Sequence, residues 1–341
     1  MSPIAFPYAT PLRVSASGLP GALTTDGPIF RSAGQPWRWA AVSAFKLCDR
    51  FAKGEDLNPF LDAYRGFNTL RVWGYVPAAD WGASAWDVPP QATILNFLDA
   101  VHGAGWLVEW TLLTDDDPAR IGPARTLVDF FAAERPPNLV IEIGNEPETH
   151  KHIDTSALRN ACEESGLLFA SGNYEDSQKF FGTYLTDHTS RDNEWPRRAH
   201  DLFEFHNGGG PNAPTDPAHN VPCVADEPAK LEDVGFSVTD WRAYFGACGL
   251  LGAGATFHSE TGKFALVPTD QERQLAAAAL EGLTAFPADA PKGPYRRIDE
   301  QGRTLRTYAV GNNMVRIRPT THASPEPGWL PIDADGILWH R

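Results

Sequence analysis

Short apolar runs, many of them rich in β-branched residues, alternate along most of the chain with segments that have helical periodicity. Eight such runs have the composition of buried parallel strands. They are Trp39–Phe45, Thr69–Tyr75, Trp106–Leu113, a run from Leu139 that stops near Glu146, Leu167–Ser171, Thr183–Thr186, Pro222–Ala225 and Gly254–His258. Strands that alternate with helices over about 250 residues predict an α/β fold, a closed (β/α)8 TIM barrel.

Between the strands, apolar residues recur at the spacing of one helix face, as they do at Ile94, Phe97, Leu98 and Val101. Helices are expected at about Leu57–Tyr64, Ile94–Val101, Leu127–Phe131, Thr155–Glu164, Ser177–Phe181, Glu194–Phe205, Thr239–Cys248 and Asp270–Leu283. An open doubly wound sheet is the alternative architecture. Its dinucleotide-binding version is weakened because no Gly-x-Gly-x-x-Gly sequence follows the first strand.

Both ends of the chain break this rhythm. Strand-like pieces near the start, such as Leu12–Ser15 and Ile29–Arg31, lie among glycines and prolines and predict a hairpin that plugs the barrel base. Near the end, Thr304–Val310 and Met314–Pro319 flank a Gly-Asn-Asn turn and predict a second hairpin. The predicted domains are therefore a hairpin segment at residues 1–36, a catalytic barrel at 37–288 and a β extension at 289–341.

Composition narrows the choice of partners. The formal net charge of -14 argues against binding to nucleic acid or to an anionic membrane through bulk charge. The sequence contains no run of 18 apolar residues, so it predicts no membrane-spanning helix. The first residues do not resemble a secretory signal. We therefore expect a soluble chain of undetermined location. The four cysteines are widely spaced, which indicates buried thiols and no zinc site. The sequence does not indicate an oligomeric state.

Two glutamates lie at the carboxyl ends of predicted barrel strands. The fourth predicted strand ends in Gly-Asn-Glu-Pro at Glu146, and the seventh ends in Asp-Glu-Pro at Glu227. Proline cannot donate to a sheet ladder, so each strand must stop at about its glutamate. The carboxyl ends of barrel strands form the face that binds ligands. Glycoside hydrolysis with retention needs two carboxyl groups about 5–5.5 Å apart on opposite sides of the scissile bond.

With these motifs, the stretch from Trp37 to about Phe286 resembles the clan A retaining glycoside hydrolases, and in particular the family-five cellulases and mannanases. The resemblance implies that Glu146 is the general acid/base and Glu227 the nucleophile. It implies that Asn145 hydrogen-bonds the 2-hydroxyl of the sugar. It also implies a β-linked oligosaccharide or polysaccharide substrate, a double-displacement mechanism, and neither a metal nor an organic cofactor.

Alternatives remain for both glutamates. Glu146 is also explained as a surface carboxylate that caps the next helix. At the seventh strand, Asp226 is an alternative functional carboxylate because strand boundaries are uncertain by a few residues. Glu260, after the eighth strand, is a weaker alternative nucleophile.

Strand alternation places Arg71, Trp73 and Tyr75 on one face. A buried arginine requires a carboxylate partner. The resemblance implies that Arg71 hydrogen-bonds the nucleophile, whereas the residues alone equally allow an ion pair with Glu109 or Glu142. Trp73 is expected either to stack on a sugar or to pack at the barrel mouth.

Two positions depart from the pattern of the resembling enzymes. Many of them carry a tyrosine or histidine near the end of strand six and a tryptophan at the end of strand eight. Here His188, in preference to Tyr184, and His258 occupy these regions and are predicted to face the substrate. A purely structural role explains each histidine about equally well.

Other functions are compatible with the sequence. The main alternative is a non-catalytic carbohydrate-binding or structural protein on a barrel scaffold, since fold alone does not settle function. A metal-dependent hydrolase would use His150 and His152, for which no third ligand is evident. The run Asp115–Asp117 before Pro118 is more typical of a helix cap than of a cation site.

Overall fold

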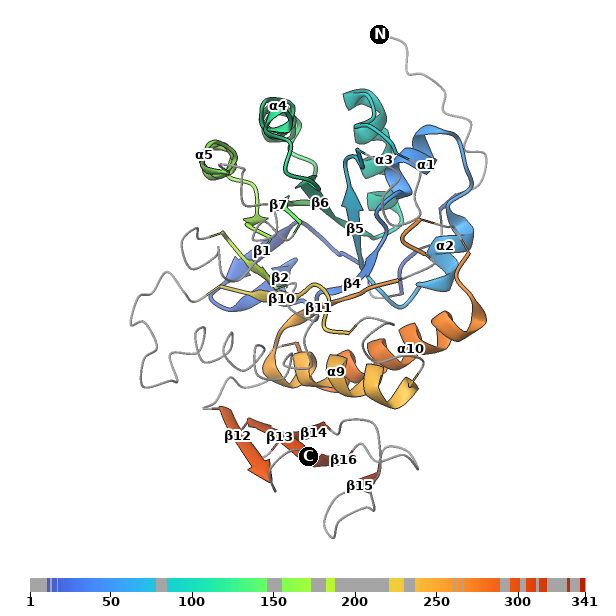
Figure 1. Cartoon of the computed structure of the whole chain (residues 1–341), viewed down its shortest axis with the longest axis vertical. Helices are drawn as coiled ribbons and strands as arrows, with labels where there is room; N and C mark the ends of the chain where they lie inside the picture. Colours follow the sequence, from blue (N-terminus) through green and yellow to red (C-terminus); the bar gives the residue numbers. More distant parts are fainter. Residues whose placement is uncertain are drawn as a thin grey trace.

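The computed structural model describes residues 11–12, 14–16, 18–77, 85–145, 155–172, 182–187, 221–229, 237–259, 262–264, 267–288, 295–300, 305–310, 313–317, 330–331 and 338–340. Its centre is a sheet of eight strands in the order β8-β7-β6-β5-β4-β11-β10-β9, and every pairing in it is parallel (Figure 1). The strands are β4 (Ala40–Ser43), β5 (Thr69–Trp73), β6 (Leu107–Leu113), β7 (Leu139–Gly144), β8 (Phe169–Ala170), β9 (Leu185–Asp187), β10 (Cys223–Ala225) and β11 (Gly254–Phe257).

Residues just before β9 bring the sheet close to closure. The Thr183 backbone N–H donates to the Phe169 carbonyl over 2.8 Å, and the Phe169 N–H donates to the Thr183 hydroxyl over 2.7 Å. Gly182 permits this approach, since a Cβ there would overlap the Phe169 carbonyl. Eight parallel strands in a nearly closed barrel confirm the predicted fold class.

Helices cover the outside of the barrel. They are α1 (Leu47–Ala52), α2 (Asn58–Ala63), α3 (Gln91–Gly103), the short 3-10 helix η2 (Pro118–Arg120), α4 (Ile121–Glu134), α5 (Ser156–Ser165), α9 (Val238–Leu251) and α10 (Asp270–Thr284). The predicted apolar face of α3 is fully buried, as its spacing requires. Among the helices in the described ranges, none offers the long apolar stretch that crossing a bilayer requires.

Some predicted elements differ from the observed ones. The described residues of the predicted strand Leu12–Ser15, which are 12, 14 and 15, are not in a strand. The Ser15 backbone N–H donates to the Ala104 carbonyl, and the Ser15 hydroxyl donates to the Phe67 carbonyl, so this residue is bonded to loops and not to a sheet. Helix α1 was not predicted, because fewer than two turns give too little periodicity to recognise. The predicted helices Ser177–Phe181 and Glu194–Phe205 lie outside the described residues.

A small antiparallel sheet closes the base of the barrel. Its strands are β1 (Leu23–Asp26), β2 (Ile29–Ser32) and β3 (Gln35–Pro36). Phe30 lies 5.1 Å from Trp39 and 5.8 Å from Tyr184, between ring centroids. These rings belong to an apolar layer inside the barrel base that also contains Ala41, Leu107, Val140, Ala170 and Val224. A hairpin therefore seals this end, and its strands are β1 and β2, with Leu23–Asp26 in place of the predicted Leu12–Ser15.

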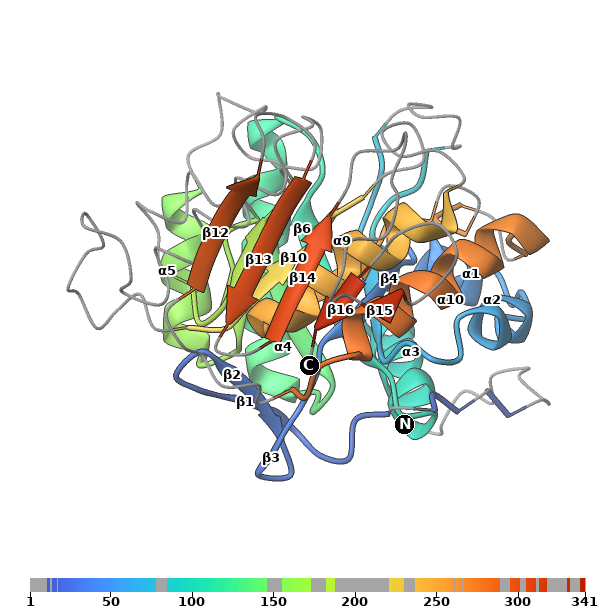
Figure 2. The same ribbon diagram turned by 90° about the horizontal axis from the view of Figure 1, so that it is seen from below.

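The C-terminal residues form a second antiparallel sheet in the order β12-β13-β14-β16-β15. Its strands are β12 (Tyr295–Glu300), β13 (Leu305–Val310), β14 (Asn313–Ile317), β15 (Leu330–Pro331) and β16 (Leu338–His340). Strands β13 and β14 contact α9, which lies between this sheet and the barrel (Figures 1 and 2). The β extension is thus present, whereas the division of the chain into three domains stays a prediction.

Candidate active site

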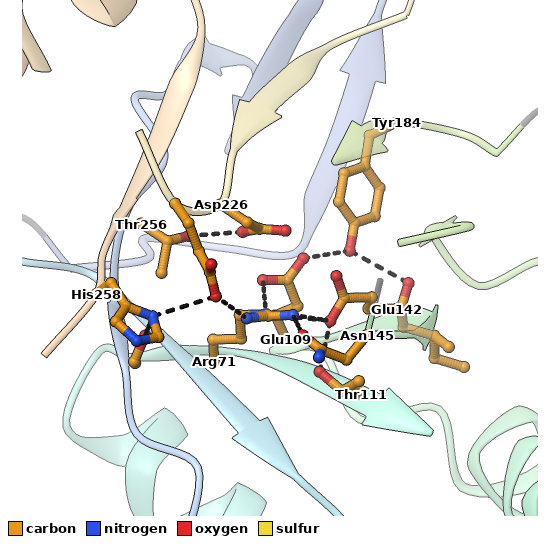
Figure 3. A network of polar contacts seen from close by, with 12 residues as sticks. Arg71, Glu109, Thr111, Glu142, Asn145, Tyr184, Asp226, Thr256 and His258 are labelled. Carbon is orange, nitrogen blue, oxygen red and sulfur yellow. Dashed lines mark hydrogen bonds and ion pairs between the residues drawn. The ribbon is translucent and has the colours of Figure 1, made fainter. Parts of the chain in front are cut away.

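Above the apolar base layer, the barrel interior becomes ionic. Arg71 on β5 is in register with Glu109 on β6, and Thr111 on β6 is in register with Glu142 on β7. Residues in register on parallel strands point to the same face, so all four side chains enter the interior. Asp226 joins them from the end of β10 (Figure 3). Each of these side chains is fully buried.

Arg71 is the centre of this network. Its Nε and Nη2 donate to Glu142 Oε2 over 3.1 and 2.8 Å, and Nη2 also donates to Asn145 Oδ1 over 2.9 Å. Its Nη1 lies 3.7 Å from Glu227 Oε1, and its Nε lies 4.0 Å from Glu109 Oε2. Arg71 and Glu227 are thus at ion-pair distance, longer than the hydrogen bond that the resemblance implied. The alternative pairs with Glu142 and Glu109 are present as well, and the pair with Glu142 is the shortest.

The guanidinium of Arg71 stays protonated in spite of its burial. Burial alone would lower the pKa of its guanidinium, but the surrounding carboxylates, Glu142 first among them, outweigh burial and raise that pKa above its ordinary value. The guanidinium is thus a permanent positive charge between the deep carboxylates and the strand end that carries Glu227.

Glu227 lies at the rim of the network. It follows β10 directly, and 4% of the residue is exposed, whereas the deeper carboxylates have no exposure. His258, just after β11, places its Nδ1 3.2 Å from Glu227 Oε1. Asp226, the alternative carboxylate, instead accepts a 2.7 Å hydrogen bond from the Thr256 hydroxyl inside the barrel. Consecutive residues thus occupy different environments, and Glu227 is the one nearer the solvent.

The interior holds more carboxyl groups than Arg71 can neutralise. Burial, followed by the charge of Glu142, raises the pKa of Glu109 to about 8, against the effects of Arg71 and of the Tyr184 hydroxyl. Burial and the charge of Glu109 raise the pKa of Asp226 well above its ordinary value. Both groups therefore tend to retain protons where an exposed carboxyl would be ionised.

Oxygens of Glu109, Glu142 and Asp226 lie within 4.8 Å of one another, the one such ligand group among the described residues. Arg71 already supplies positive charge to this cluster. Glu142 Oε2 accepts hydrogen bonds from two Arg71 nitrogens and from the Thr111 hydroxyl, the last over 2.6 Å. The carboxylate oxygens of this group are thus compensated by the Arg71 guanidinium and by protons on the carboxyl groups themselves. We assign no metal to the group.

Asn145 connects the network to the end of β7. Its backbone N–H donates to the Leu113 carbonyl over 2.9 Å, and its side-chain oxygen accepts from Arg71. This assigns the amide orientation and makes the NH2 group the part that can donate to a ligand. The next residue, Glu146, lies outside the described residues, as do His188, Glu260 and the pair His150 and His152.

Aromatic residues pack beside the rim. Trp73 stacks on Phe45 with ring centroids 3.9 Å apart and is 2% exposed. In this structure Trp73 is therefore packed against another side chain, which is the second of the two expectations. Both belong to a cluster with Val76 and Trp86, whose backbones form an isolated antiparallel bridge. Contact between Trp73 and a sugar stays a prediction.

Two residues that were weighed as alternatives in the sequence make structural contacts. The Tyr184 hydroxyl donates to Glu109 over 2.8 Å from the barrel interior, so Tyr184 supports the network from below. Asp117 accepts from the Ala119 N–H and caps η2, as the sequence indicated. Sequence reasoning missed Lys263 and the hydroxyls of Ser43 and Thr256, because nothing in local periodicity links these positions to the two glutamates.

No family model matches the chain, and a search of curated proteins finds no match. Solved structures do match. A candidate glycoside hydrolase from Bacteroides vulgatus aligns with TM-score 0.53 and 12% identity, covering 86% of this chain and 66% of that one. An endo-1,4-beta-mannanase from Rhizomucor miehei aligns with TM-score 0.50 and 12% identity, covering 76% and 99%. The chain has the fold of these glycoside hydrolases. At this identity the likeness shows the fold alone, and it confirms the predicted resemblance at that level.

Proposed function

We propose that this chain is a retaining glycoside hydrolase in which Glu227 is the nucleophile and Glu146 the general acid/base. The observation that carries the proposal is the environment of Glu227. It stands at the end of a barrel strand, within 3.7 Å of the permanent charge of Arg71 and 3.2 Å of His258. A carboxylate that must attack an anomeric carbon needs such partners to stay ionised. Asn145, bonded to the same arginine, immediately precedes Glu146 in the chain.

In the proposed mechanism, Glu146 protonates the glycosidic oxygen while a Glu227 oxygen attacks the anomeric carbon. The bond to the leaving group breaks as the glycosyl–Glu227 ester forms. Glu146, now a carboxylate, takes a proton from water, which attacks the same carbon and releases Glu227. Asn145 donates to the 2-hydroxyl of the sugar, a contact that strengthens in the transition state. The reaction needs neither a metal nor an organic cofactor.

A β-linked glycan is the proposed substrate class. The mannanase that shares the fold supports including β-mannan in a screen, together with β-glucans and aryl β-glycosides. The net charge of -14 favours neutral glycans over acidic ones, because the chain as a whole repels anions.

The test compares the parent with Glu146→Gln and Glu227→Gln on this panel. Both variants should hydrolyse aryl glycosides more slowly, Glu146→Gln by roughly 10²–10⁴-fold, as expected for loss of a general acid. Glu134→Gln, at the exposed end of α4, is the matched control and should keep full activity. If either site variant is as fast as the parent, its assignment is wrong.

Two readouts separate the proposal from its alternatives. Proton NMR of the first product should show the β-anomer before mutarotation, since two displacements at one carbon retain configuration. A first-formed α-anomer would contradict the nucleophilic role of Glu227. Glycan binding without product over long incubation would instead favour a non-catalytic carbohydrate-binding protein.

A further inference from the structure

One charged side chain behind Glu227 has no part in the mechanism above. Lys263 lies in the short turn after β11, and its Nζ is 3.4 Å from His258 Nε2. The other ring nitrogen of His258, Nδ1, is 3.2 Å from Glu227 Oε1. The imidazole thus stands between a lysine and the proposed nucleophile.

The lysine fixes which ring nitrogen carries hydrogen. An ammonium group has only hydrogens to donate, so His258 Nε2 must be the acceptor in its contact with Lys263. A neutral imidazole that accepts at Nε2 carries its hydrogen on Nδ1. Nδ1 is also the ring nitrogen that lies 3.2 Å from Glu227 Oε1, and the Ser43 hydroxyl is 3.5 Å from it. With the hydrogen on Nδ1, the two contacts allow donation in one direction, from Lys263 through His258 to Glu227.

The turn that carries Lys263 is anchored at its backbone. The Lys263 N–H donates to the Ser259 carbonyl over 3.1 Å, and the Lys263 carbonyl accepts from the Lys46 N–H over 3.2 Å. The Ser259 hydroxyl is itself held by Glu272 at 2.6 Å, by Tyr64 at 2.5 Å and by the Gly262 N–H at 2.7 Å. Such a buried network fixes the position of the backbone from which the lysine side chain extends.

We propose that Lys263 and His258 are positioning residues that hold Glu227 in its attacking orientation, an inference that rests on the proposed function of Glu227. His258 donates to one carboxylate oxygen, and Lys263 keeps the imidazole in the tautomer able to do so. The carboxylate then has two partners from different parts of the barrel, Arg71 on β5 and His258 just after β11. This restricts its rotation and favours its ionised form.

The first test measures the tautomer and requires no substrate. Long-range ¹H–¹⁵N spectra should show His258 of the parent with hydrogen on Nδ1, the signal being assigned by its loss in His258→Gln. In Lys263→Met this signal should move toward the other tautomer. Lys53→Met, which removes an exposed lysine paired with Asp49, should leave it unchanged. Hydrogen on Nε2 in the parent, or an unchanged pattern in Lys263→Met, would overturn the inference.

The second test uses kinetics. Lys263→Met should lower kcat by roughly tenfold, the size expected for a lost hydrogen bond to a charged group, with little change in KM. Lys263→Arg, which keeps a donor, should recover most of the loss. His258→Asn, whose amide can replace Nδ1–H, should be faster than His258→Gln, whose amide lies nearer the Nε2 position. Equal rates for these two variants would contradict the assigned hydrogen bond.

The two tests separate failure of the inference from failure of the proposed function. If the parent hydrolyses no glycoside but shows the Nδ1–H tautomer that depends on Lys263, the hydrogen-bond chain stands and the glycosidase proposal falls. If the parent is an active glycosidase and Lys263→Met changes neither tautomer nor kcat, the function stands and the positioning role is wrong.

Discussion

At the scale of single residues, the barrel interior contains more carboxyl groups than one arginine can neutralise. One guanidinium, that of Arg71, interacts with the carboxyl groups of Glu142, Asp226, Glu227 and Glu109. An uncompensated buried charge costs several kcal/mol, so four ionised carboxylates cannot be held by one arginine. Arg71 and Thr111 donate to Glu142, which favours its charged form. Glu109 and Asp226, with raised pKa values, are the groups that keep protons.

This balance predicts how stability varies with pH. The pKa of Glu109 rises from 4.5 to about 8 on folding, so the folded state binds its proton more tightly. Its contribution to stability is complete below about pH 4.5, declines between about pH 4.5 and 8, and is constant above. In Glu109→Gln, a neutral side chain of the same shape, the free energy of unfolding should fall less steeply over this range, by at most about 1.4 kcal/mol per pH unit.

Urea denaturation at a series of pH values measures this slope. Glu134→Gln, on the exposed end of α4, is the control and should follow the parent at every pH. If the curves of Glu109→Gln and the parent run parallel from pH 5 to 8, Glu109 titrates like an exposed carboxyl and the charge balance above is wrong.

The sequence predicted the contacts of these residues only in part. Arg71 in a buried strand predicted a carboxylate partner, and Glu109, Glu142 and Glu227 were all reasonable partners. The pattern could not rank them, because every residue of β5 and β7 is buried and alternation no longer separates inside from outside. Lys263 carries no signal at all, since its contact with His258 depends on the path of a turn.

At the scale of elements, composition located the eight strands because buried parallel strands are apolar and β-branched. It overestimated the length of the fifth, since only Phe169–Ala170 pairs as β8. Pairing depends on the neighbouring strand, and local composition contains no information about that neighbour. The same limit explains the wrong strand at Leu12–Ser15, which has apolar residues but bonds to loops.

One glycine fixes how β7 and β8 end together. Gly172 has φ +102°, and a Cβ on it would overlap the carbonyl of Gly144, the residue before Asn145. Gly172→Ala should therefore displace the end of β7, lower the free energy of unfolding by about 2 kcal/mol or more and reduce any hydrolase activity. Thermal unfolding and rates on aryl glycosides measure both effects.

Gly34→Ala is the matched control for this substitution. Gly34 also has a positive φ, of +76°, but an added Cβ there meets nothing within 4 Å. It should cost only the backbone penalty, about 1–2 kcal/mol, with no change in activity. Equal effects of the two substitutions would show that the approach of Gly172 to Gly144 is unimportant.

At the scale of the whole molecule, one end of the barrel is closed by apolar side chains, and the other end carries Glu227. The N-terminal sheet closes the base through Phe30, which packs on Trp39 and Tyr184. The Tyr184 hydroxyl then donates to Glu109 in the ionic layer above. The apolar base, the ionic layer and the rim with Glu227 are thus stacked along the barrel, and the ionic layer separates the rim from the base.

This stacking predicts that damage at the base weakens the fold more than the chemistry. Phe30→Ala removes a ring that is 4% exposed and should lower the free energy of unfolding by about 3–5 kcal/mol. Phe130→Ala, which removes a partly buried ring on α4, should cost less than half as much. If Glu227 is the nucleophile, the folded fraction of Phe30→Ala should keep the kcat of the parent, because Arg71 and His258 hold the rim independently of the base. Urea titration gives the stability, and rates scaled to that fraction give the kcat; a kcat that falls in proportion to the lost stability would mean that the layers are not mechanically separate.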